Sequence, residues 1–480
     1  MSENLNFIAG AWRPAASGRT FERRNPADSG DLIGTFPASG PEDASAAIEV
    51  LRKAAPKWAK SSPEQRMQVL EKTADLMLAR ADELARELTR EEGKTLAEAA
   101  NEVKRTAANF RLYAGEALRI RGETFPAESG QIVLSMRRPV GIVAAITPWN
   151  FPISIPARKI GPALAAGNVV LFKPAGLTPL MGQRLVELLL EAGLPPEAIA
   201  LVQGSGAAVG DTIVAGADAI TFTGSYPTGR GIYMQAGPER RTQLEMGGKN
   251  PCIVLEDADP EVAANVIVRG AFGLSGQACT GTSRVLAVGA VYDAVLERVV
   301  AKAEAVAVGN GLHQGVTMGP VASETQLDTV LRYIDIGIAE GATLAAGGGR
   351  LCGNGHDAGW FVRPTVFADV PPGARIQREE IFGPVVGLQR VGNLDEAIAA
   401  ANDVEYGLAA SVVTRDLGRV IDFAERIDAG VVKVNSPTTG VALTAPFGGV
   451  KHSSNQTYKE QAGHGVMDFY TTTKTVYLAG

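Results

Sequence analysis

Between residues 141 and 222 the chain alternates short apolar runs, rich in Val, Ile and Ala, with segments long enough to form helices. Short apolar runs bounded by turn-forming residues are typical of fully buried strands. Strands separated by helix-length segments pair in parallel through right-handed crossovers, because a tight hairpin can join only antiparallel strands. The pattern predicts a doubly wound parallel sheet with strands at 141–146, 168–172, 198–203 and 219–222.

A second alternating series follows the first and predicts a second α/β unit. Its expected strands lie at 252–255, 284–288, 410–414 and 431–434. Upstream, residues 42–119 are rich in Ala, Leu, Glu and Arg and have apolar residues near helical spacing, which predicts helices. The tail, 468–478, has the composition of a strand but no neighbour in sequence to pair with. We expect this strand to join the sheet of another subunit.

The composition excludes several classes of protein. The chain has 480 residues, of which 45% are hydrophobic, so it can bury more than one core. Its 46 basic and 52 acidic residues give a net charge of −6 without a dense run of one sign. Nucleic acid is therefore not expected as a partner. The uncharged stretch 139–157 is broken by four prolines and is not expected to span a membrane.

The cysteines and histidines indicate a cytoplasmic protein without a metal centre. Three cysteines cannot pair completely, and none has the C-x-x-C spacing of a zinc or disulfide motif. No two of the four histidines stand at the spacing of helical metal ligands. The first ten residues lack the basic and apolar regions of a secretion signal. We expect a protein of the reducing cytoplasm with no catalytic metal.

Three polar residues are candidates for catalysis. Cys279 stands among small and polar neighbours, unlike a typical buried structural cysteine, although an inert thiol is the alternative. An ordinary thiol is only slightly ionised at pH 7, so Cys279 needs a base or a dipole to act as a nucleophile. Glu245 ends a strand-like run before a Gly-Gly turn. It could act as a general base, or it could be a carboxylate solvated in the turn. Asn150 follows the first strand. Its side-chain amide could donate a hydrogen bond to a reacting group, or it could cap a helix.

Two junctions between an expected strand and an expected helix could hold a dinucleotide. Gly204 begins a G-x-G-x-x-x-G turn after the strand at 198–203, but this spacing departs from the usual fingerprint and also fits a simple turn. Ser225 follows the strand at 219–222 and could cap a helix whose N–H groups face a phosphate. Two such junctions together favour a dinucleotide site.

These residues belong to a set of strings whose order and spacing resemble the aldehyde dehydrogenase superfamily. The strings are PWNFP at 148–152, FTGS at 222–225, LEMGGK at 244–249, GQAC at 276–279 and EIFGP at 380–384. The resemblance implies an α/β fold with two doubly wound domains and a small β extension for oligomerisation, in a homodimer or homotetramer. The implied ranges are 1–120 and 140–247 for the dinucleotide-binding domain, 248–447 for the catalytic domain, and 121–139 and 448–480 for the oligomerisation segment.

The resemblance also implies a reaction on a small aldehyde. The Cys279 thiolate attacks the aldehyde carbon, and the oxyanion of the thiohemiacetal is held by the Asn150 amide and the Cys279 N–H. Hydride passes to the nicotinamide, and Glu245 activates the water that hydrolyses the resulting thioester. An acylating enzyme that uses coenzyme A is disfavoured because it does not need Glu245, and a non-catalytic relative is disfavoured because all three residues are intact.

The cofactor contacts implied by the resemblance are spread along the chain. Trp149 and Lys173 are expected near the adenosine. Ser225 is expected at the pyrophosphate, Glu380 on the nicotinamide ribose, and Phe382 beside that ribose.

Two positions depart from the commonest pattern of the family. Gly176 stands where many NAD-preferring members have a Glu that binds the adenosine ribose, so both NAD and NADP remain open. Thr472 stands where some members have a second Glu, proposed as a proton relay, so Glu245 is expected to act without it.

The expected substrate carries a carboxylate. Arg158 follows Asn150 by eight residues and is similar to the arginine with which succinate semialdehyde dehydrogenases bind the distal carboxylate. A surface arginine is the alternative. The strings at 276–284 and 451–461 are more similar to 2-oxoglutarate semialdehyde dehydrogenases. We expect NAD(P)-dependent oxidation of 2-oxoglutarate semialdehyde to 2-oxoglutarate, with succinate semialdehyde or a broad range of aldehydes as alternatives.

Overall fold

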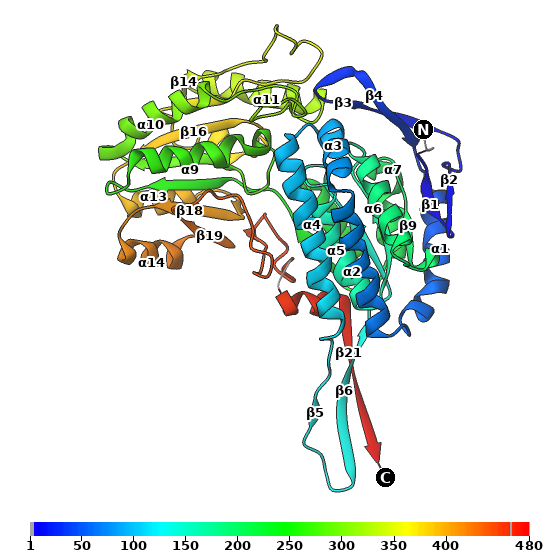
Figure 1. The fold of residues 1–480 in the computed structure, drawn as a ribbon. Helices are drawn as coiled ribbons and strands as arrows, with labels where there is room; N and C mark the ends of the chain where they lie inside the picture. Colours follow the sequence, from blue (N-terminus) through cyan, green and yellow to red (C-terminus); the bar gives the residue numbers. More distant parts are fainter. Residues whose placement is uncertain (1–3, 461–462, 480) are drawn as a thin grey trace.

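Two seven-stranded sheets with helices on their faces make up most of the protein, and a narrow three-stranded arm projects from the first of them (Figure 1). The computed structural model describes residues 4–460 and 463–479. Residues 1–3, 461–462 and 480 therefore lie outside the described residues. They include the start of the expected range 1–120, parts of the expected range 448–480, and the last residue of the string at 451–461. The predicted α/β fold is confirmed.

The first sheet has the strand order β11-β10-β7-β8-β9-β1-β2, and five of these strands run parallel. Every residue of β7, β8 and β10 is buried, which explains their nearly continuous apolar sequence. All four predicted strands of this series are confirmed, and two short antiparallel strands extend the sheet. The strands are β1 (Asn6–Ile8), β2 (Ala11–Arg13), β7 (Ile142–Ile146), β8 (Val169–Lys173), β9 (Ile199–Leu201), β10 (Ala219–Thr223) and β11 (Arg241–Glu245).

Helices cover both faces of this sheet, and four of them occupy the region predicted to be helical. Their ends follow local capping chemistry: the Thr95 hydroxyl and the Glu98 carboxylate form a capping box, and Gly93 ends the preceding helix in the left-handed region. The helices are α1 (Pro41–Trp58), α2 (Pro63–Ala79), α3 (Ala81–Glu92), α4 (Leu96–Ala117), α5 (Ser154–Ala165), α6 (Pro179–Glu191), α7 (Gly206–Gly216) and α8 (Tyr226–Ala236), with a 3₁₀ turn at Pro196–Ala198. The strands β3 (Thr20–Asn25) and β4 (Asp28–Pro37) form a separate ribbon.

The second sheet has the order β14-β15-β16-β13-β12-β18-β19, and only β14 runs antiparallel to its neighbour. It contains the four strands predicted for the second series. The strands are β12 (Asn250–Val254), β13 (Thr282–Val288), β14 (Thr343–Ala346), β15 (Thr365–Ala368), β16 (Val385–Val391), β18 (Ala409–Val413) and β19 (Val431–Val434). The accompanying elements are α9 (Pro260–Phe272), α10 (Gly289–Glu304), α11 (Glu324–Ala339), α12 (Arg375–Arg378), α13 (Leu394–Asn402), α14 (Leu417–Arg426), β17 (Tyr406–Gly407), β20 (Val450–Lys451) and a 3₁₀ turn at Gly273–Gly276.

The arm consists of β5 (Thr124–Phe125), β6 (Gln131–Pro139) and β21 (Thr471–Ala479). A 3₁₀ turn at Gly463–Val466 and the short helix α15 (Met467–Tyr470) lead into β21. The tail has no neighbour in sequence to pair with, as expected, but it does have a partner within its own chain, because β21 pairs antiparallel with all nine residues of β6. The partner lies more than 300 residues earlier, so a reading of neighbouring sequence could not find it.

The order of the strands fixes where a ligand can bind to the first sheet. The chain builds outward from β7 through β8 and β9 and then returns to place β10 on the other side of β7. The carboxyl ends of β7 and β10 therefore flank a topological switch point, which is the usual place for a ligand in such sheets. In the described part of the chain, no helix is long and apolar enough to cross a membrane.

Candidate active site

The two sheets meet where the chain passes from β11 to β12. Glu245 is the last residue of β11, and Asn250, the first residue of β12, follows after only a short turn. Cys279 lies just before β13, the neighbour of β12. The carboxyl edge of the first sheet thus adjoins the amino edge of the second, and this junction brings Glu245 and Cys279 together.

A cavity of about 370 Å³ occupies this junction. Cys279, Glu245 and Arg158 all line it, together with Phe151 and Glu460. The cavity draws its walls from β10 and β11 of the first sheet, from α4 and α5, and from α9 and loops of the second unit, so residues far apart in sequence share one volume. Three of the residues singled out from sequence are therefore neighbours of a single enclosed space.

Asn150 lies behind the cavity wall rather than on it. Its side-chain Nδ2 donates to the Gln277 carbonyl oxygen at 2.9 Å, two residues before Cys279. Its second Nδ2 proton and the backbone N–H of Cys279 have no acceptor among the described residues. The alternative that Asn150 caps a helix is wrong, since Ile153 occupies the N-cap of α5. Two unused N–H donors therefore accompany the thiol.

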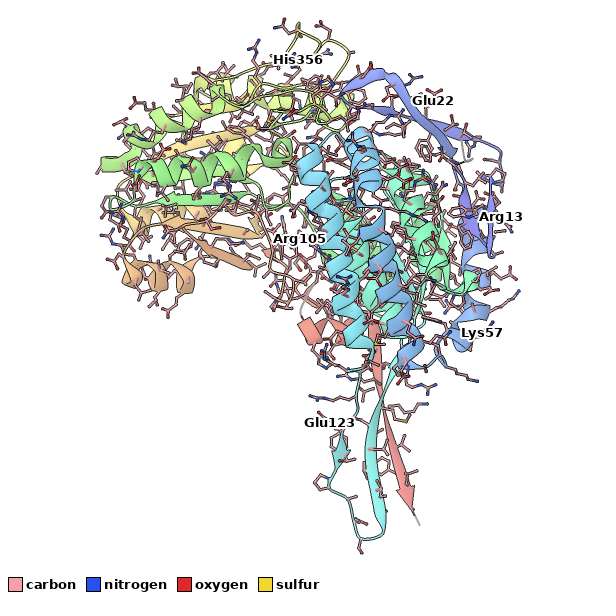
Figure 2. The ribbon with its side chains drawn as sticks, viewed as in Figure 1. Arg13, Glu22, Lys57, Arg105, Glu123 and His356 are labelled. Atoms are coloured by element: carbon pink, nitrogen blue, oxygen red, sulfur yellow. The ribbon has the colours of Figure 1, made fainter. Side chains whose placement is uncertain are left out.

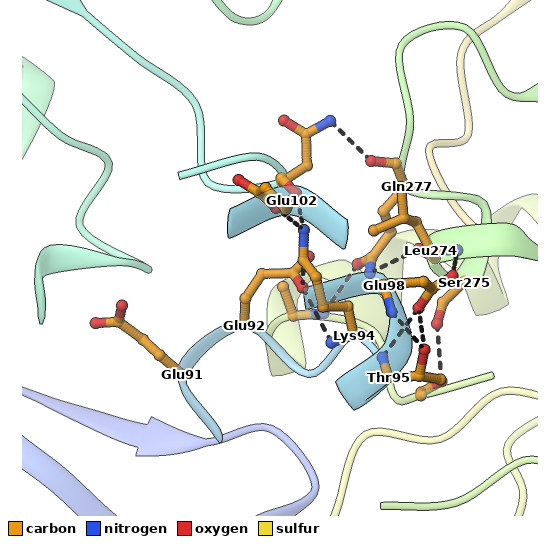
Figure 3. Close-up of polar contacts among 12 residues, drawn as sticks. Glu91, Glu92, Lys94, Thr95, Glu98, Glu102, Leu274, Ser275 and Gln277 are labelled. Carbon is orange, nitrogen blue, oxygen red and sulfur yellow. Dashed lines mark hydrogen bonds and ion pairs between the residues drawn. The ribbon is translucent and has the colours of Figure 1, made fainter. Parts of the chain in front are cut away.

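The loop before Cys279 is held in an unusual backbone conformation. Leu274, Ser275 and Gly276 all have positive φ, at 54°, 54° and 70°. A non-glycine residue in this region costs of order 1–3 kcal/mol, so the surroundings must enforce it. Glu98 accepts from the Leu274 N–H at 2.8 Å, and the Ser275 hydroxyl donates to the Gly319 carbonyl at 2.8 Å (Figure 3).

Two glycines allow other segments to approach this loop. A Cβ on Gly276 would lie 2.1 Å from the Gly383 carbonyl oxygen, and a Cβ on Gly248 would lie 2.5 Å from the Cys279 carbonyl oxygen. Asn250 donates to the same Cys279 carbonyl at 2.8 Å. The glycines of the GQAC, LEMGGK and EIFGP strings thus serve the packing around the thiol.

A buried lysine connects α4 to the loop of Asn150. Lys94 donates from Nζ to the Asn150 carbonyl oxygen at 2.7 Å and to the Glu102 carboxylate at 2.6 Å (Figure 3). The other oxygen of Glu102 accepts from the Ser154 N–H at 3.1 Å, at the start of α5. This chain of contacts orders the segment that carries Asn150.

Glu245 is almost completely enclosed, with 1% of its surface exposed, so the alternative of a solvated turn carboxylate is wrong. Neither of its carboxylate oxygens has a hydrogen-bond partner among the described residues. Burial raises the pKa of Glu245 well above its ordinary value, and the nearby Glu460 carboxylate raises it further. A carboxylate in this state is a stronger base than one in water.

The Cys279 thiol is not ionised in advance. Burial, followed by the charge of Glu380, raises the pKa of Cys279 to about 12. The sequence indicated that a base or dipole has to assist the thiol, and no depressed pKa supplies that assistance here. Proton removal must therefore accompany any attack by sulfur.

Arg158 is buried, with 8% of its surface exposed, so the alternative of a surface arginine is wrong. Its contacts are loose: Nη1 lies 3.7 Å from the Glu460 carboxylate and Nη2 lies 3.5 Å from the Ser154 hydroxyl. Its Nε has no partner among the described residues. Glu460 is bound more closely by Lys159, at 2.8 Å. A guanidinium group without a close acid faces the cavity.

The expected cofactor residues gather at the carboxyl edge of the first sheet. Trp149 follows β7, Ser225 follows β10 and Lys173 ends β8. Burial lowers the pKa of Lys173 to about 8, and the only acceptor of its Nζ among the described residues is the Pro174 carbonyl, at 2.9 Å. No atom lies within 4 Å of the position that a Cβ on Gly176 would take. A buried amine without an acid beside open space suits an anionic ligand.

The EIFGP string reaches the same edge from the second unit. The Phe382 ring packs edge-on against Trp149 with centroids 5.3 Å apart. Glu380 accepts from the Gly248 N–H at 3.0 Å, and burial raises its pKa to about 7. A Cβ on Gly247 would lie 2.3 Å from the Glu380 carboxylate, so the Gly-Gly turn makes room for it.

At the two junctions between a strand and a helix, the roles of Ser225 and Gly204 differ from those expected. Ser225 is the N-cap residue of α8, but its hydroxyl pairs with that of Thr228 and does not cap the helix. Gly204 has φ of 115°, and a Cβ there would lie 2.9 Å from the Ser39 backbone nitrogen. Packing against the segment before α1 thus accounts for the glycine at position 204.

Sequence reasoning missed Glu460, Lys94 and Arg105. Glu460 lies near the end of the chain, and nothing near it in sequence indicates that it is buried beside Arg158. Arg105 lines the cavity from α4. Its signal was available, because Glu98, Glu102 and Arg105 recur at helical spacing and form one polar face.

Comparison with known proteins gives a uniform result. Residues 12–476 match the aldehyde dehydrogenase family. The alpha-ketoglutaric semialdehyde dehydrogenase of Bacillus subtilis is 43% identical over 99% of this chain and 98% of its own. The alpha-ketoglutarate semialdehyde dehydrogenase of Haloferax volcanii is 44% identical over 98% of each chain. The crystal structure of betaine aldehyde dehydrogenase from Staphylococcus aureus in complex with NAD+ has a TM-score of 0.96 at 33% identity, covering 99% of this chain and 95% of that one.

Proposed function

Because the chain belongs to the aldehyde dehydrogenase family, we propose that it oxidises 2-oxoglutarate semialdehyde to 2-oxoglutarate with NAD or NADP as the hydride acceptor. The observation that carries the proposal is the position of Arg158, whose buried guanidinium shares a cavity with Cys279 and has no close acid. The names of the two semialdehyde dehydrogenases at 43% and 44% identity support it. Succinate semialdehyde is the alternative substrate, since it also carries a distal carboxylate.

The first chemical step is addition of Cys279 to the aldehyde. The sulfur–carbon bond forms, the carbonyl π electrons move to oxygen, and the thiol proton leaves. That proton leaves through the cavity to solvent water, so Glu245, which lines the same cavity with a raised pKa, stays free to act as the base in the later hydrolysis. The unused N–H groups of Cys279 and Asn150 are suited to hold the oxyanion, and loss of one such donor typically costs about 2.7–4 kcal/mol.

The second stage is hydrolysis of a thioester. A nicotinamide bound at the proposed crevice would supply the carbon that accepts hydride from the former aldehyde carbon. The thioester left on Cys279 is then attacked by water, whose proton passes to Glu245. The carbon–sulfur bond breaks, the leaving Cys279 sulfur takes up the proton held by Glu245, and the product leaves as a carboxylate.

The proposed cofactor residues suit a dinucleotide and the negative charge of its phosphate groups. Lys173 supplies a buried cation, Ser225 stands at the N-terminus of α8, and Glu380 and Phe382 reach the Trp149 side of the crevice. The open space at Gly176 excludes neither an adenosine ribose hydroxyl nor a 2′-phosphate. The proposal therefore covers both NAD and NADP as cofactors.

The arm is the proposed site of oligomerisation. The outer edge of β21 and the outer edge of β19 have no strand partner among the described residues. Each edge offers unpaired backbone groups that a strand of a second copy can satisfy. We propose that β21 of one copy extends the second sheet of another through β19.

The test is a comparison of initial rates with 2-oxoglutarate semialdehyde, succinate semialdehyde and neutral pentanal, each with NAD and with NADP. We expect kcat/KM to be at least about tenfold higher for the two acids than for pentanal, because a paired guanidinium is worth about 1.5–3 kcal/mol. A preference for pentanal would contradict the proposed substrate class. The ratio of the two acids distinguishes the main substrate from its alternative.

A further inference from the structure

The cavity has a second guanidinium that the proposed mechanism does not use. Arg105 belongs to α4 and lines the cavity together with Arg158. Figure 2 places Arg105 on the side of α4 that looks toward the second sheet. It is half-buried, and among the described residues its only hydrogen-bond partner is the Val441 carbonyl oxygen. Most of its N–H groups are therefore free to meet a ligand.

The packing of α4 on α5 places Arg105 beside Arg158. Glu102 of α4 contacts the backbone of Ser154 at the start of α5. Further along, Gly161 of α5 approaches the Tyr113 ring of α4 so closely that a Cβ there would lie 2.8 Å from it. The two helices thus run side by side in the same direction.

Helical geometry then determines the neighbours one turn onward. Arg105 lies about one turn after Glu102, and Arg158 lies about one turn after Ser154, so the two arginines occupy the same level of the cavity wall. Consistent with this, burial and then the charge of Arg158 lower the pKa of Arg105.

Arg158 shares the Glu460 carboxylate with Lys159, and among the described residues no ion pair joins Arg105 to an acid. Lys159 binds Glu460 at 2.8 Å, closer than Arg158 does, and Lys94 binds Glu102 at 2.6 Å. Two partly desolvated guanidinium groups side by side repel each other unless an anion lies between them. The cavity is therefore suited to an anionic ligand with several acceptor oxygens.

We propose that Arg105 and Arg158 together hold the 2-oxo acid end of the substrate, and that Arg105 distinguishes a 2-oxo acid from a simple carboxylate. A lone carboxylate needs only one guanidinium fork. A 2-oxo acid adds a carbonyl oxygen next to the carboxylate, so its acceptors can bridge two forks. The inference rests on the proposed function, because it assumes that the aldehyde end reaches Cys279.

The experiment uses aldehydes matched in length. 2-Oxoglutarate semialdehyde and glutarate semialdehyde have the same five-carbon chain and differ only in the 2-oxo group, and pentanal lacks both the oxo group and the carboxylate. In Arg105→Met we expect kcat/KM to fall by about 10- to 100-fold for the 2-oxo acid, by less than about threefold for glutarate semialdehyde, and not at all for pentanal.

Further variants separate recognition from structure. Arg158→Met should lower kcat/KM for both acids. Arg105→Lys should recover part of the loss, because an ammonium keeps the charge without the fork. Arg13→Met is the matched control, since Arg13 is exposed on β2, away from the cavity (Figure 2). It should leave all three rates unchanged.

The outcomes distinguish the two proposals. Equal losses for all three aldehydes in Arg105→Met would overturn the inference alone, as would equal losses for the two acids. If the unmodified enzyme preferred pentanal to both acids, the proposed function would fail and the inference with it.

Discussion

At the scale of single residues, the chemistry depends on Cys279. Burial and the charge of Glu380 raise the pKa of its thiol to about 12, which favours the protonated form, so attack by sulfur requires loss of that proton. We predict that Cys279→Ala lowers turnover by at least about 10³-fold, because Cys279 carries the only thiol among the described residues that line the cavity. Initial rates measure the loss, and calorimetric titration should show unchanged cofactor binding. Residual activity near that of the unmodified enzyme would refute the covalent mechanism.

Glu245 should separate the two halves of the reaction. We predict that Glu245→Gln still releases a burst of reduced cofactor but slows the steady state by about 10²-fold or more, because hydrolysis of the thioester needs a base. Stopped-flow absorbance resolves the burst from the later rate. Absence of the burst would show that Glu245 is also indispensable for the addition step.

The same residue should affect stability in a pH-dependent way. Burial raises the folded-state pKa of Glu245, so the folded protein holds this proton more tightly than the unfolded chain does. The resulting stabilisation is present at low pH and is lost as pH rises toward the raised pKa. We predict that Glu245→Gln has a higher Tm than the unmodified protein at pH 8 and that the difference shrinks toward pH 5. Thermal melts across this range check the sign.

Sequence reasoning at this scale succeeded where chemistry is carried by contiguous strings. Cys279 and Glu245 stand in such strings, and the structure places both in one cavity. Glu460 and Arg105 could not be ranked in the same way, because their relevance depends on how α4, α5 and the end of the chain pack. Burial of Arg158 is likewise a product of the fold and not of its neighbours in sequence.

At the scale of elements, the start of α4 braces the site. Lys94 binds Glu102 in a fully buried pair and holds the Asn150 carbonyl. We predict that Lys94→Met destabilises the protein by about 3–5 kcal/mol, because it leaves an uncompensated buried carboxylate. Denaturant unfolding measures this loss. Lys57→Met is the control: Lys57 is exposed on α1 (Figure 2) and should change stability by no more than about 0.5 kcal/mol. An equal effect of the two substitutions would contradict the brace.

Elements were predictable from sequence to different degrees. Strands such as β7 and β8 are buried on both faces, and a continuous apolar run is a strong signal for them. β16 is interrupted by Gly387 and carries the half-buried Gln389 and the exposed Arg390 before its last residue, so it lacks that signal. The pairing of β21 with β6 depends on the global path of the chain, which no local pattern encodes.

At the scale of the whole molecule, the two sheets divide the work. The first sheet supplies the crevice with Trp149 and Lys173, and the second positions Cys279 before β13. Glu245 is the last residue of the first sheet before the chain crosses to the second. The order of strands and the site are thus consequences of one arrangement, in which the carboxyl edge of one sheet adjoins the amino edge of the other.

The arm leads to a prediction about assembly. Leu478 and Ile132 are paired across β21 and β6, and Met136 lies on the same face of the ribbon. Their exposed fractions are 49%, 58% and 42%, which is unusual for large apolar side chains on a thin ribbon that has no core of its own. A second copy that covers this face would remove the apolar surface from water.

We predict that Ile132→Glu shifts the protein from an oligomer toward monomers, because a carboxylate in the covered face would have to lose its hydration without a partner. Light scattering coupled to size-exclusion chromatography measures the mass, and circular dichroism checks that the chain stays folded. Ile338→Glu is the matched control: Ile338 on α11 is 48% exposed and lies far from the arm (Figure 1), so the mass should not change. An oligomer that survives Ile132→Glu at micromolar concentration would exclude this face as the interface.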